Sequence, residues 1–220
     1  MTGWREPARL RSALRLYVVV DPDQSAGRPP MAVAEAAVQG GATAIQLRHR
    51  QATARVLCEL GSALASLCAM HGVLFVMNDR LDVALACGAA GVHLGQEDLP
   101  ARLARGIGGP DLVVGVSAAT PAEARRAEGD GADYLGVGSV YRTDSKPDAG
   151  KPITCAGLAR VVAATMLPAV GIGGMRADRV ADVLAAGATG VAVISAVCSA
   201  GDIRLATAAM AEALAGRAEA

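Results

Sequence analysis

The chain has 220 residues, a length that suits a single domain, and 52% of them are hydrophobic although only 2% are aromatic. We therefore expect a core built from Ala, Val, Leu and Ile. Basic and acidic residues balance at 21 each, so the chain lacks the basic excess that binding a nucleic-acid backbone requires.

The N-terminal segment and the cysteines indicate in which cellular compartment the protein is expected. Residues 1–15 are rich in Arg but lack the apolar stretch of a secretory signal, and no apolar run reaches the roughly 18 residues needed to span a bilayer. The five cysteines form no C-x-x-C pair and have apolar neighbours, so we interpret them as buried, reduced thiols. We therefore expect a cytoplasmic protein with no membrane partner.

Short β-branched runs alternate with Ala- and Leu-rich stretches of helical character. In chain order, the eight expected strands are Leu16–Asp21, Ala44–Arg48, Leu74–Asp79, Gly91–Leu94, Leu112–Ser117, Asp133–Gly138, Pro168–Gly173 and Gly190–Ser195. The expected helices are Met31–Gln39, Thr53–Met70, Leu81–Cys87, Leu99–Ile107, Pro121–Glu128, Cys155–Thr165, Arg176–Ala186 and Asp202–Ala215. Thr53, Thr120 and Thr154 stand where residues that initiate helices are expected.

This alternation predicts an α/β fold, a single (β/α)₈ TIM barrel. Near-continuous apolar strands such as Leu16–Val20 indicate burial on both faces, as in a parallel sheet covered by helices. Eight strand-then-helix units in strict order favour a closed barrel over an open sheet. We assign residues 16–220 to the barrel and residues 1–15 to an N-terminal extension.

A Gly-Ala pair recurs between a helix and the next strand, at residues 41–42, 88–89, 131–132 and 187–188. We predict that each Gly ends its helix in a left-handed conformation.

Function in a barrel of this kind is expected at the carboxyl ends of the strands, where polar residues indeed gather. Gln46 and Arg48 are two residues apart and therefore share one face of their strand. An Arg pointing into a barrel needs an anionic partner, which could be a phosphorylated ligand or a carboxylate such as Asp79.

Asp79 and Asp98 follow neighbouring strands, so their carboxylates could converge. With Arg and Lys nearby, one interpretation is Mg²⁺ held between these carboxylates and a diphosphate. The alternatives are a general acid–base pair, or salt bridges with Arg80 and Arg102.

A second phosphate region is predicted elsewhere on the same rim. The loop after the sixth strand carries Thr143, Ser145 and Lys146, and glycines 173–174 follow the seventh strand. Together with a short helix starting near Ser195, they match the recurrent phosphate site of such barrels. Two regions imply two phosphorylated small molecules, or a single long one. The three histidines, at positions 49, 71 and 93, are interpreted as structural.

From Leu16 to Ser195 the chain resembles the thiamine phosphate synthase family. The resemblance rests on short motifs in a fixed order: residues 46–48, 78–80, 93–96 with Asp98, 115–117, 143–146, 171–174 and 194–195. It implies a transferase that couples hydroxymethylpyrimidine diphosphate to thiazole phosphate and releases diphosphate. A homo-oligomer is compatible with the sequence, although no stripe identifies an interface.

The resemblance also implies roles for individual residues. Asp79 and Asp98 would hold Mg²⁺, and Arg48, Lys146 and Ser117 would carry the catalysis. The residues implied in substrate binding are Gln46, Leu47, Arg48, His49, Arg50, Asn78, Ser117, Thr143, Asp144, Ser145, Lys146, Gly174, Ile194 and Ser195.

Three positions depart from the family pattern. Arg50 stands where Lys is usual, Ser145 where Thr is usual, and Ala119 where His is common. Some thiazole tautomerases of this superfamily use a His at the position of Ala119. The alternatives are therefore a tautomerase-like isomerase, which Ala119 disfavours, or a non-catalytic ligand-binding barrel derived from a synthase.

Overall fold

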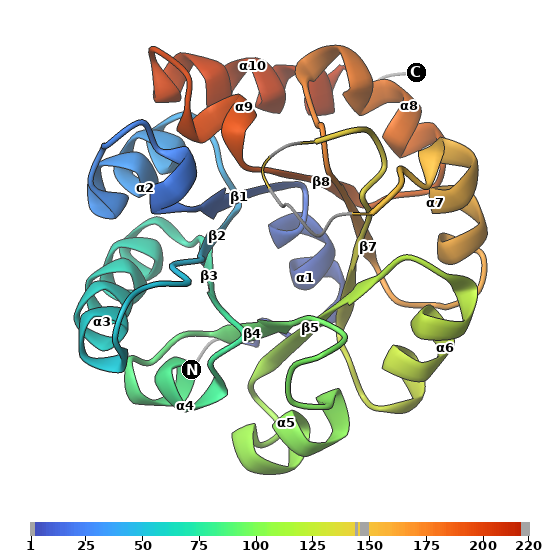
Figure 1. Cartoon of the computed structure of the whole chain (residues 1–220), viewed down its shortest axis with the longest axis horizontal. Helices are drawn as coiled ribbons and strands as arrows, with labels where there is room; N and C mark the ends of the chain where they lie inside the picture. Colours follow the sequence, from blue (N-terminus) through green and yellow to red (C-terminus); the bar gives the residue numbers. More distant parts are fainter. Residues whose placement is uncertain (1–2, 144, 146–149, 217–220) are drawn as a thin grey trace.

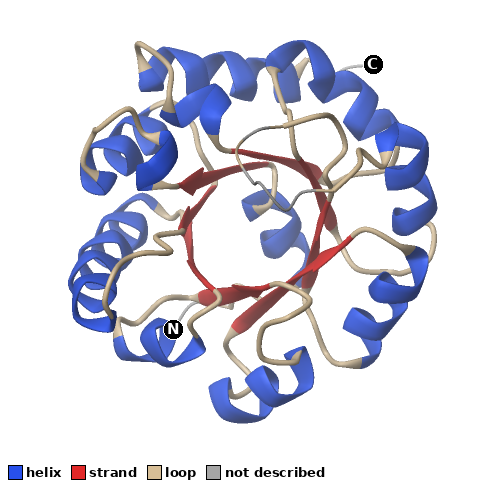
Figure 2. Ribbon diagram, in the orientation of Figure 1, coloured by secondary structure: helices blue, strands red, loops and turns tan. Residues whose placement is uncertain are grey.

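The computed structural model describes residues 3–143, 145 and 150–216. Eight parallel strands close into a barrel in sequence order, and helices surround it (Figures 1 and 2). The strands are β1 Leu16–Val20, β2 Ala44–Leu47, β3 Leu74–Asn78, β4 Gly91–Leu94, β5 Val113–Ala118, β6 Tyr134–Val137, β7 Ala169–Ile172 and β8 Gly190–Val193. The predicted (β/α)₈ barrel is confirmed, with every strand within about two residues of its expected bounds.

Helices follow the strands as expected. They are α2 Pro30–Gln39, α3 Ala54–His71, α4 Leu81–Ala86, α5 Ala101–Gly108, α6 Pro121–Gly129, α7 Thr154–Val162, α8 Val180–Ala185, α9 Ser195–Cys198 and α10 Ile203–Ala215. Short 3₁₀ turns, η1 Pro22–Gln24 and η2 Ala177–Arg179, precede α2 and α8. None of the helices in the described part of the chain is both long and apolar enough to cross a membrane.

The starts of three helices test whether Thr53, Thr120 and Thr154 initiate helices as predicted. Thr53 accepts a hydrogen bond from the backbone of Val56, and Thr120 forms a reciprocal capping box with Glu123. Thr154 does not cap α7, because its own backbone is left-handed (φ 65°) and Ile153 occupies the capping position without a side-chain bond. Helix α7 therefore begins at Thr154, but this threonine does not cap it.

The Gly-Ala pairs end their helices as predicted. All four glycines have positive φ, between 71° and 100°. In each pair the alanine N–H donates to a carbonyl five residues earlier, which closes the last helical turn: 42 to 37, 89 to 84, 132 to 127 and 188 to 183. The repeated Gly-Ala pair therefore forms the same helix-ending turn at four places in the fold.

Strand alternation divides the core into two clusters. The larger one lies between the strands and the surrounding helices and consists mostly of Val, Leu and Ala. The smaller one fills the barrel interior and includes Tyr17, Leu74, Val113 and Tyr134. With few aromatic residues, the close-packed outer layer depends on small and branched side chains.

The N-terminal residues form part of the inner cluster. Helix α1, Pro7–Ala13, lies within the ring of strands when the barrel is viewed along its axis (Figures 1 and 2). Trp4 and Leu10 are buried and pack with the inward side chains of the strands. The Arg9 guanidinium lies 4.0 Å from the centre of the Trp4 ring. Helix α1 therefore closes the end of the barrel where the strands begin.

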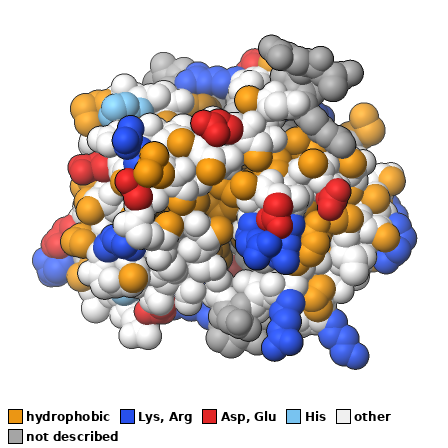
Figure 3. Space-filling model, turned by 90° about the horizontal axis from the view of Figure 1, so that it is seen from above, with side chains coloured by type: hydrophobic (Ala, Val, Ile, Leu, Met, Phe, Trp, Pro, Cys, Tyr) orange, Lys and Arg blue, Asp and Glu red, His pale blue; other side chains and the backbone are white. Residues whose placement is uncertain are grey.

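The outer surface carries charges of both signs. Figure 3, which looks onto the side covered by α10, shows Lys and Arg side chains interspersed with Asp, Glu and hydrophobic ones. Large exposed hydrophobic residues, among them Met70, Ile107 and Met166, belong to different elements of the fold.

We predict that Leu10→Ala lowers the free energy of unfolding by about 3 kcal/mol, because the side chain is buried against the strands and its removal leaves a cavity. Urea denaturation of the purified protein measures this loss. Arg11→Ala, on the same helix but exposed, is the control and should change stability by about 0.5 kcal/mol or less. A loss below about 1 kcal/mol for Leu10→Ala would show that α1 does not stabilise the barrel.

Candidate active site

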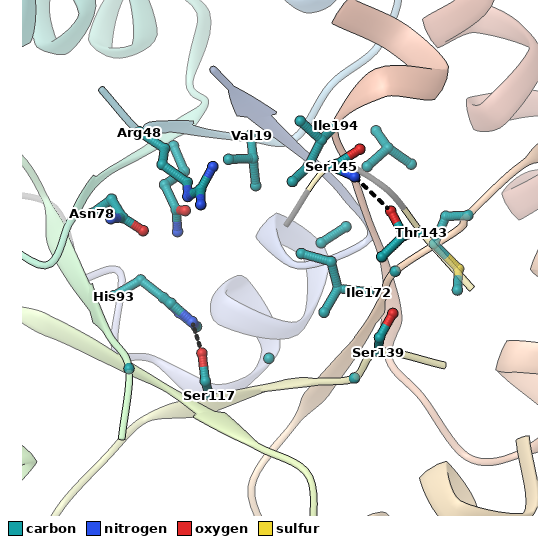
Figure 4. Close-up of a pocket in the computed structure, with 18 of the residues that line it drawn as sticks. Val19, Arg48, Asn78, His93, Ser117, Ser139, Thr143, Ser145, Ile172 and Ile194 are labelled. Atoms are coloured by element: carbon teal, nitrogen blue, oxygen red, sulfur yellow. Dashed lines mark hydrogen bonds between the residues drawn. The ribbon is translucent and has the colours of Figure 1, made fainter. Parts of the chain in front are cut away.

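A cavity of about 650 Å³ opens at the carboxyl ends of the strands. Residues from all eight strands and from the loops that follow them line it, as the barrel architecture predicts. Figure 4 shows Arg48, Asn78 and His93 on one side and Thr143, Ser145 and Ile194 on the other. The predicted site residues that line the cavity are Gln46, Arg48, Arg50, Asn78, Asp79, Asp98, Ser117, Thr143, Ser145, Gly174, Ile194 and Ser195.

Two residues implied in substrate binding do not line this cavity. Leu47 is fully buried in the outer cluster, because alternation along β2 turns it toward the helices while Gln46 faces the interior. His49 is also absent from the lining, and its Nδ1 atom is buried without a hydrogen-bond partner. Neither residue lines the cavity, so a role of Leu47 or His49 in substrate binding stays a prediction. Asp144 and Lys146 lie outside the described residues.

Arg48 points inward and is paired with a carboxylate that sequence reasoning did not select. Its Nη1 donates to Asp21, which directly follows β1, and both side chains are at least nine-tenths buried. The Nη2 atom of Arg48 is buried and has no hydrogen-bond partner. The guanidinium is therefore held by one carboxylate and keeps donors for an anion.

Asp21 is anchored at the same time. Its Oδ1 accepts from the backbone of Asp23 and so caps the short turn η1, while its backbone carbonyl accepts from the Ser25 hydroxyl. The signal for this partner was present in the sequence, because Asp21 ends the first expected strand just as Arg48 ends the second.

Asp79 and Asp98 converge, as their strand positions predicted. Burial raises the pKa of Asp79 to about 6, and the neighbouring Asp98 carboxyl adds to this rise, against the opposing charge of Arg48. Asp79 also has a left-handed backbone (φ 61°), which is costly for a residue other than Gly. Asp98 is held by the backbone N–H of Gly95, at 2.6 Å from its Oδ2.

This carboxylate pair fits a hard divalent cation. A carboxyl group whose pKa is raised by burial and by a neighbouring carboxyl is relieved when a cation lies between the two. Among the described residues no group of three or more His, Cys, Asp or Glu side chains could form a full protein cage for a metal. Mg²⁺ does not need one, since it commonly takes one or two carboxylates together with waters and substrate phosphates.

Among the described residues, the opposite side of the cavity carries no charged side chain and is rich in small residues. Gly173 and Gly174 follow β7 with positive φ, and Arg179 donates to the Gly174 carbonyl at 2.5 Å. The Ser145 hydroxyl donates to Ser195 at 3.0 Å, which links the loop after β6 to the start of α9. Hydroxyls and glycine backbone together can hold a phosphate group.

Several lining residues were not predicted. Gln96 donates to the carbonyl of Ser117 at 2.6 Å, and Glu97, Glu123 and Ser139 also face the cavity. His93, which was interpreted as structural, lines the cavity and contacts Ser117 through Nε2 at 3.0 Å (Figure 4). Strand alternation was the available signal for His93, because it lies two residues after Gly91 on the inward face of β4.

Comparisons with known proteins agree on one family. Residues 16–197 match the family model described as thiamine monophosphate synthase. A thiamine-phosphate synthase of Moorella thermoacetica is 55% identical over 188 residues, covering 86% of this chain and 90% of that protein. One from Natronomonas pharaonis is 50% identical over 204 residues, covering 91% and 95%. The solved structure of a thiamine phosphate pyrophosphorylase from Pyrococcus furiosus has a TM-score of 0.86 at 41% identity, covering 94% of this chain and 98% of that one.

We predict that Asp21→Asn lowers the free energy of unfolding by about 3 kcal/mol, because it leaves the buried Arg48 guanidinium without a counter-charge. Asn keeps the oxygen that caps η1, so the loss reports the charge. Adding inorganic diphosphate should recover part of the stability by supplying an anion to Arg48. Thermal melts with and without diphosphate measure both effects.

Asp23→Asn, two residues away and exposed, is the matched control and should leave the melting temperature unchanged. A melting temperature for Asp21→Asn equal to that of the control would contradict the pairing.

We also predict a pH-dependent gain in stability from Asp79→Asn in the presence of EDTA. The folded pKa of Asp79, about 6, lies above the value of about 3.9 expected in the unfolded chain. The unfolded chain therefore releases its proton first, and the protein loses stability as the pH rises from about 4 through 6. Asn removes this cost, which amounts to about 1 kcal/mol once solvent screening is allowed for.

The expected gain in melting temperature is about 3 °C above pH 7 and vanishes near pH 4. Thermal melts of wild type and variant across this range measure it, with the exposed Asp111→Asn as control. Saturating Mg²⁺ should remove the advantage of the variant. A pH-independent difference between variant and wild type would contradict the raised pKa.

Proposed function

Since the chain belongs to the thiamine monophosphate synthase family of transferases, we propose that this cavity joins hydroxymethylpyrimidine diphosphate to thiazole phosphate. The products are thiamine phosphate and diphosphate. The observation that carries this assignment is the division of one cavity into a charged half, with Arg48 beside Asp79 and Asp98, and a neutral half of glycines and hydroxyls.

In this proposal the charged half binds the diphosphate substrate. Arg48 offers its unpartnered Nη2, and Arg50 and Asn78 line the same side of the cavity. Arg50 replaces the Lys usual in the family and keeps the positive charge, although its planar guanidinium can contact two phosphate oxygens at once. Lys146, which lies outside the described residues, would add a further cation by the family resemblance.

Asp79 and Asp98 would hold Mg²⁺. Their proximity and the raised pKa of Asp79 support this assignment, since burial and the Asp98 carboxyl both disfavour negative charge on Asp79, which a cation would relieve. When bound, the ion would neutralise charge on the diphosphate. The left-handed backbone of Asp79 and the bond from Gly95 to Asp98 place the two carboxylates before any ligand arrives.

The neutral half would bind the thiazole phosphate. Gly174 exposes backbone to the cavity, and Thr143, Ser145 and Ser195 supply hydroxyls. A phosphate monoester carries less charge than a diphosphate, so neutral donors can hold it without a metal ion. Contacts at both ends would bring the two rings together in the middle of the cavity.

The coupling needs no protein nucleophile. The bond between the benzylic-type carbon and the diphosphate oxygen breaks, and its electron pair leaves with diphosphate. The aminopyrimidine ring stabilises the resulting cation, and the thiazole nitrogen then forms the new C–N bond. The protein's part is to stabilise the leaving charge through Arg48, Ser117 and Lys146 and to hold both partners in line.

The two alternatives fit less well. A tautomerase-like isomerase would need a proton-transferring group, and Ala119 lines the cavity where some tautomerases have His. A non-catalytic barrel would have no reason to retain the strained Asp79 beside Asp98. The relatives that are 45–55% identical and named thiamine-phosphate synthase favour neither alternative.

We predict that the purified protein, given both substrates and Mg²⁺, forms thiamine phosphate and diphosphate in equal amounts. Asp79→Ala should lower kcat/KM by about 100-fold or more, because it removes a carboxylate that positions the metal and diphosphate. Chromatography of the products and a diphosphate assay measure both. Asp111→Ala, distant from the cavity and exposed, is the control.

Two results would contradict this function: full activity of Asp79→Ala, or activity that EDTA does not diminish. Conversion of a thiazole tautomer without any coupling would instead support the isomerase.

A further inference from the structure

Five side chains form a continuous hydrogen-bond chain across the barrel interior. They come from five strands: Gln46 on β2, Tyr17 on β1, Tyr134 on β6, His93 on β4 and Ser117 on β5. The two ends, Gln46 and Ser117, line the cavity, as does His93, whereas the tyrosines are completely buried beneath it. The hydrogen-bond chain therefore connects two residues of the cavity wall by way of side chains buried beneath the cavity.

The bonds of this chain are of normal length. Gln46 Nε2 donates to the Tyr17 hydroxyl at 2.8 Å, and the two phenol oxygens are 2.9 Å apart. The Tyr134 oxygen lies 3.0 Å from His93 Nδ1, and His93 Nε2 lies 3.0 Å from the Ser117 oxygen (Figure 4). Each atom of the chain is thus within reach of its neighbours on both sides.

Two glycines make room for it. Gly115 is in register with both His93 and Tyr134, and a Cβ at Gly115 would overlap the Tyr134 ring. A Cβ at Gly136 would approach the His93 ring to 2.9 Å. The strands therefore leave space at two positions for the rings on either side, which places the phenol and the imidazole in contact.

The first donor sets the direction of every bond in the chain. An amide nitrogen cannot accept, so the Tyr17 proton can go only to Tyr134. Both phenols stay protonated because burial raises their pKa well above the usual value. The Tyr134 proton then goes to His93 Nδ1, and a neutral imidazole that accepts at Nδ1 carries its proton on Nε2.

The direction of the last bond determines what Ser117 offers to the cavity. His93 Nε2–H donates to the Ser117 oxygen, so the hydroxyl's own proton is free to turn away from His93, toward the cavity. At the other end, Gln46 donates one of its two N–H groups to Tyr17, which orients the amide and leaves its carbonyl oxygen as an acceptor.

We propose that Tyr17, Tyr134 and His93 are positioning residues that make Ser117 a hydrogen-bond donor, and Gln46 an acceptor, toward the diphosphate substrate. This inference rests on the proposed function for the identity of that substrate. The atom that meets Ser117 must be an acceptor, either a diphosphate oxygen or a ring nitrogen of the pyrimidine.

The first test reads the histidine directly. ¹⁵N NMR of the ¹⁵N-histidine-labelled protein distinguishes the two neutral tautomers, and the spectrum of His93→Gln identifies the His93 signals among those of three histidines. We expect the Nε2–H tautomer in the wild type. The Nδ1–H tautomer, or a protonated ring at pH 7.5, would overturn the proposal.

Tyr17→Phe is the decisive variant because the hydrogen bonds described for Tyr17 join it to Gln46 and Tyr134, not to His93 or Ser117. Without its hydroxyl, Tyr134 can either donate to His93 or accept from it, so His93 should become a mixture of tautomers. An unchanged His93 tautomer would contradict a chain of fixed direction. Tyr141→Phe, which removes a hydroxyl bonded to Cys155 outside the chain, should leave the His93 signals unchanged.

Kinetics provide a separate readout. Tyr134→Phe and Tyr17→Phe should lower kcat/KM for the pyrimidine diphosphate by about 3- to 10-fold, the effect of one weakened hydrogen bond. The KM of the thiazole phosphate should not change. An equal loss for both substrates would indicate a merely structural role and overturn the proposal.

Binding of two probes shows whether the atom that accepts from Ser117 belongs to the diphosphate or to the pyrimidine ring. If Ser117 donates to the leaving group, Tyr17→Phe weakens binding of inorganic diphosphate with Mg²⁺. If it donates to the ring, the variant instead weakens binding of the uncharged hydroxymethylpyrimidine. Unchanged binding of both probes would overturn the proposal. The binding measurements and the NMR need no turnover. An inactive protein with the expected His93 tautomer would therefore disprove the proposed function but not the hydrogen-bond chain.

Discussion

A polar side chain can point into this barrel only where a partner satisfies it, because an unsatisfied polar group in a packed interior costs about 1–3 kcal/mol. The interior follows this constraint at three levels, and the buried Nη2 atom of Arg48 is an exception that a ligand would satisfy. Trp4 and Leu10 fill the end where the strands begin and pack against apolar side chains there. The phenols of Tyr17 and Tyr134 lie above that layer and bond to each other. Charged groups that a ligand can reach, among them Arg48 and Asp79, lie at the carboxyl ends.

At the carboxyl ends of the strands, some charged side chains have a partner of opposite charge and others do not. Asp21 and Arg48 neutralise each other, which offsets much of the cost of burying the two charges. Asp79 and Asp98 are both carboxylates, and Asp79 also has a left-handed backbone. Their imbalance opposes folding and favours a cation, as is common where a site is built for a ligand rather than for stability. The neutral side of the cavity, with Gly174 and Ser195, carries no comparable cost.

Much of the architecture followed from local pattern. Apolar runs flanked by helical periodicity located all eight strands, and the Gly-Ala pairs located four helix ends. Part of the site followed as well, since Gln46 and Arg48 alternate with Leu47 and only the even positions face the interior. The same alternation excludes Leu47 from the cavity, although its motif resembles the family. Helix α1 was missed because an arginine-rich surface concealed the two buried residues, Trp4 and Leu10.

The sequence by itself determined that the chain forms a closed parallel barrel and that its polar residues gather at one rim, because both follow from which faces of each element are apolar. It did not determine the partners. Asp21 meets Arg48 across 27 residues, and His93 meets Tyr134 across 41. Such pairs depend on strand register and on barrel closure, which bring residues that are far apart in the sequence to the same height along the barrel axis. Only the tertiary structure therefore decided that His93 belongs to a hydrogen-bond chain and that Arg48 is held by Asp21.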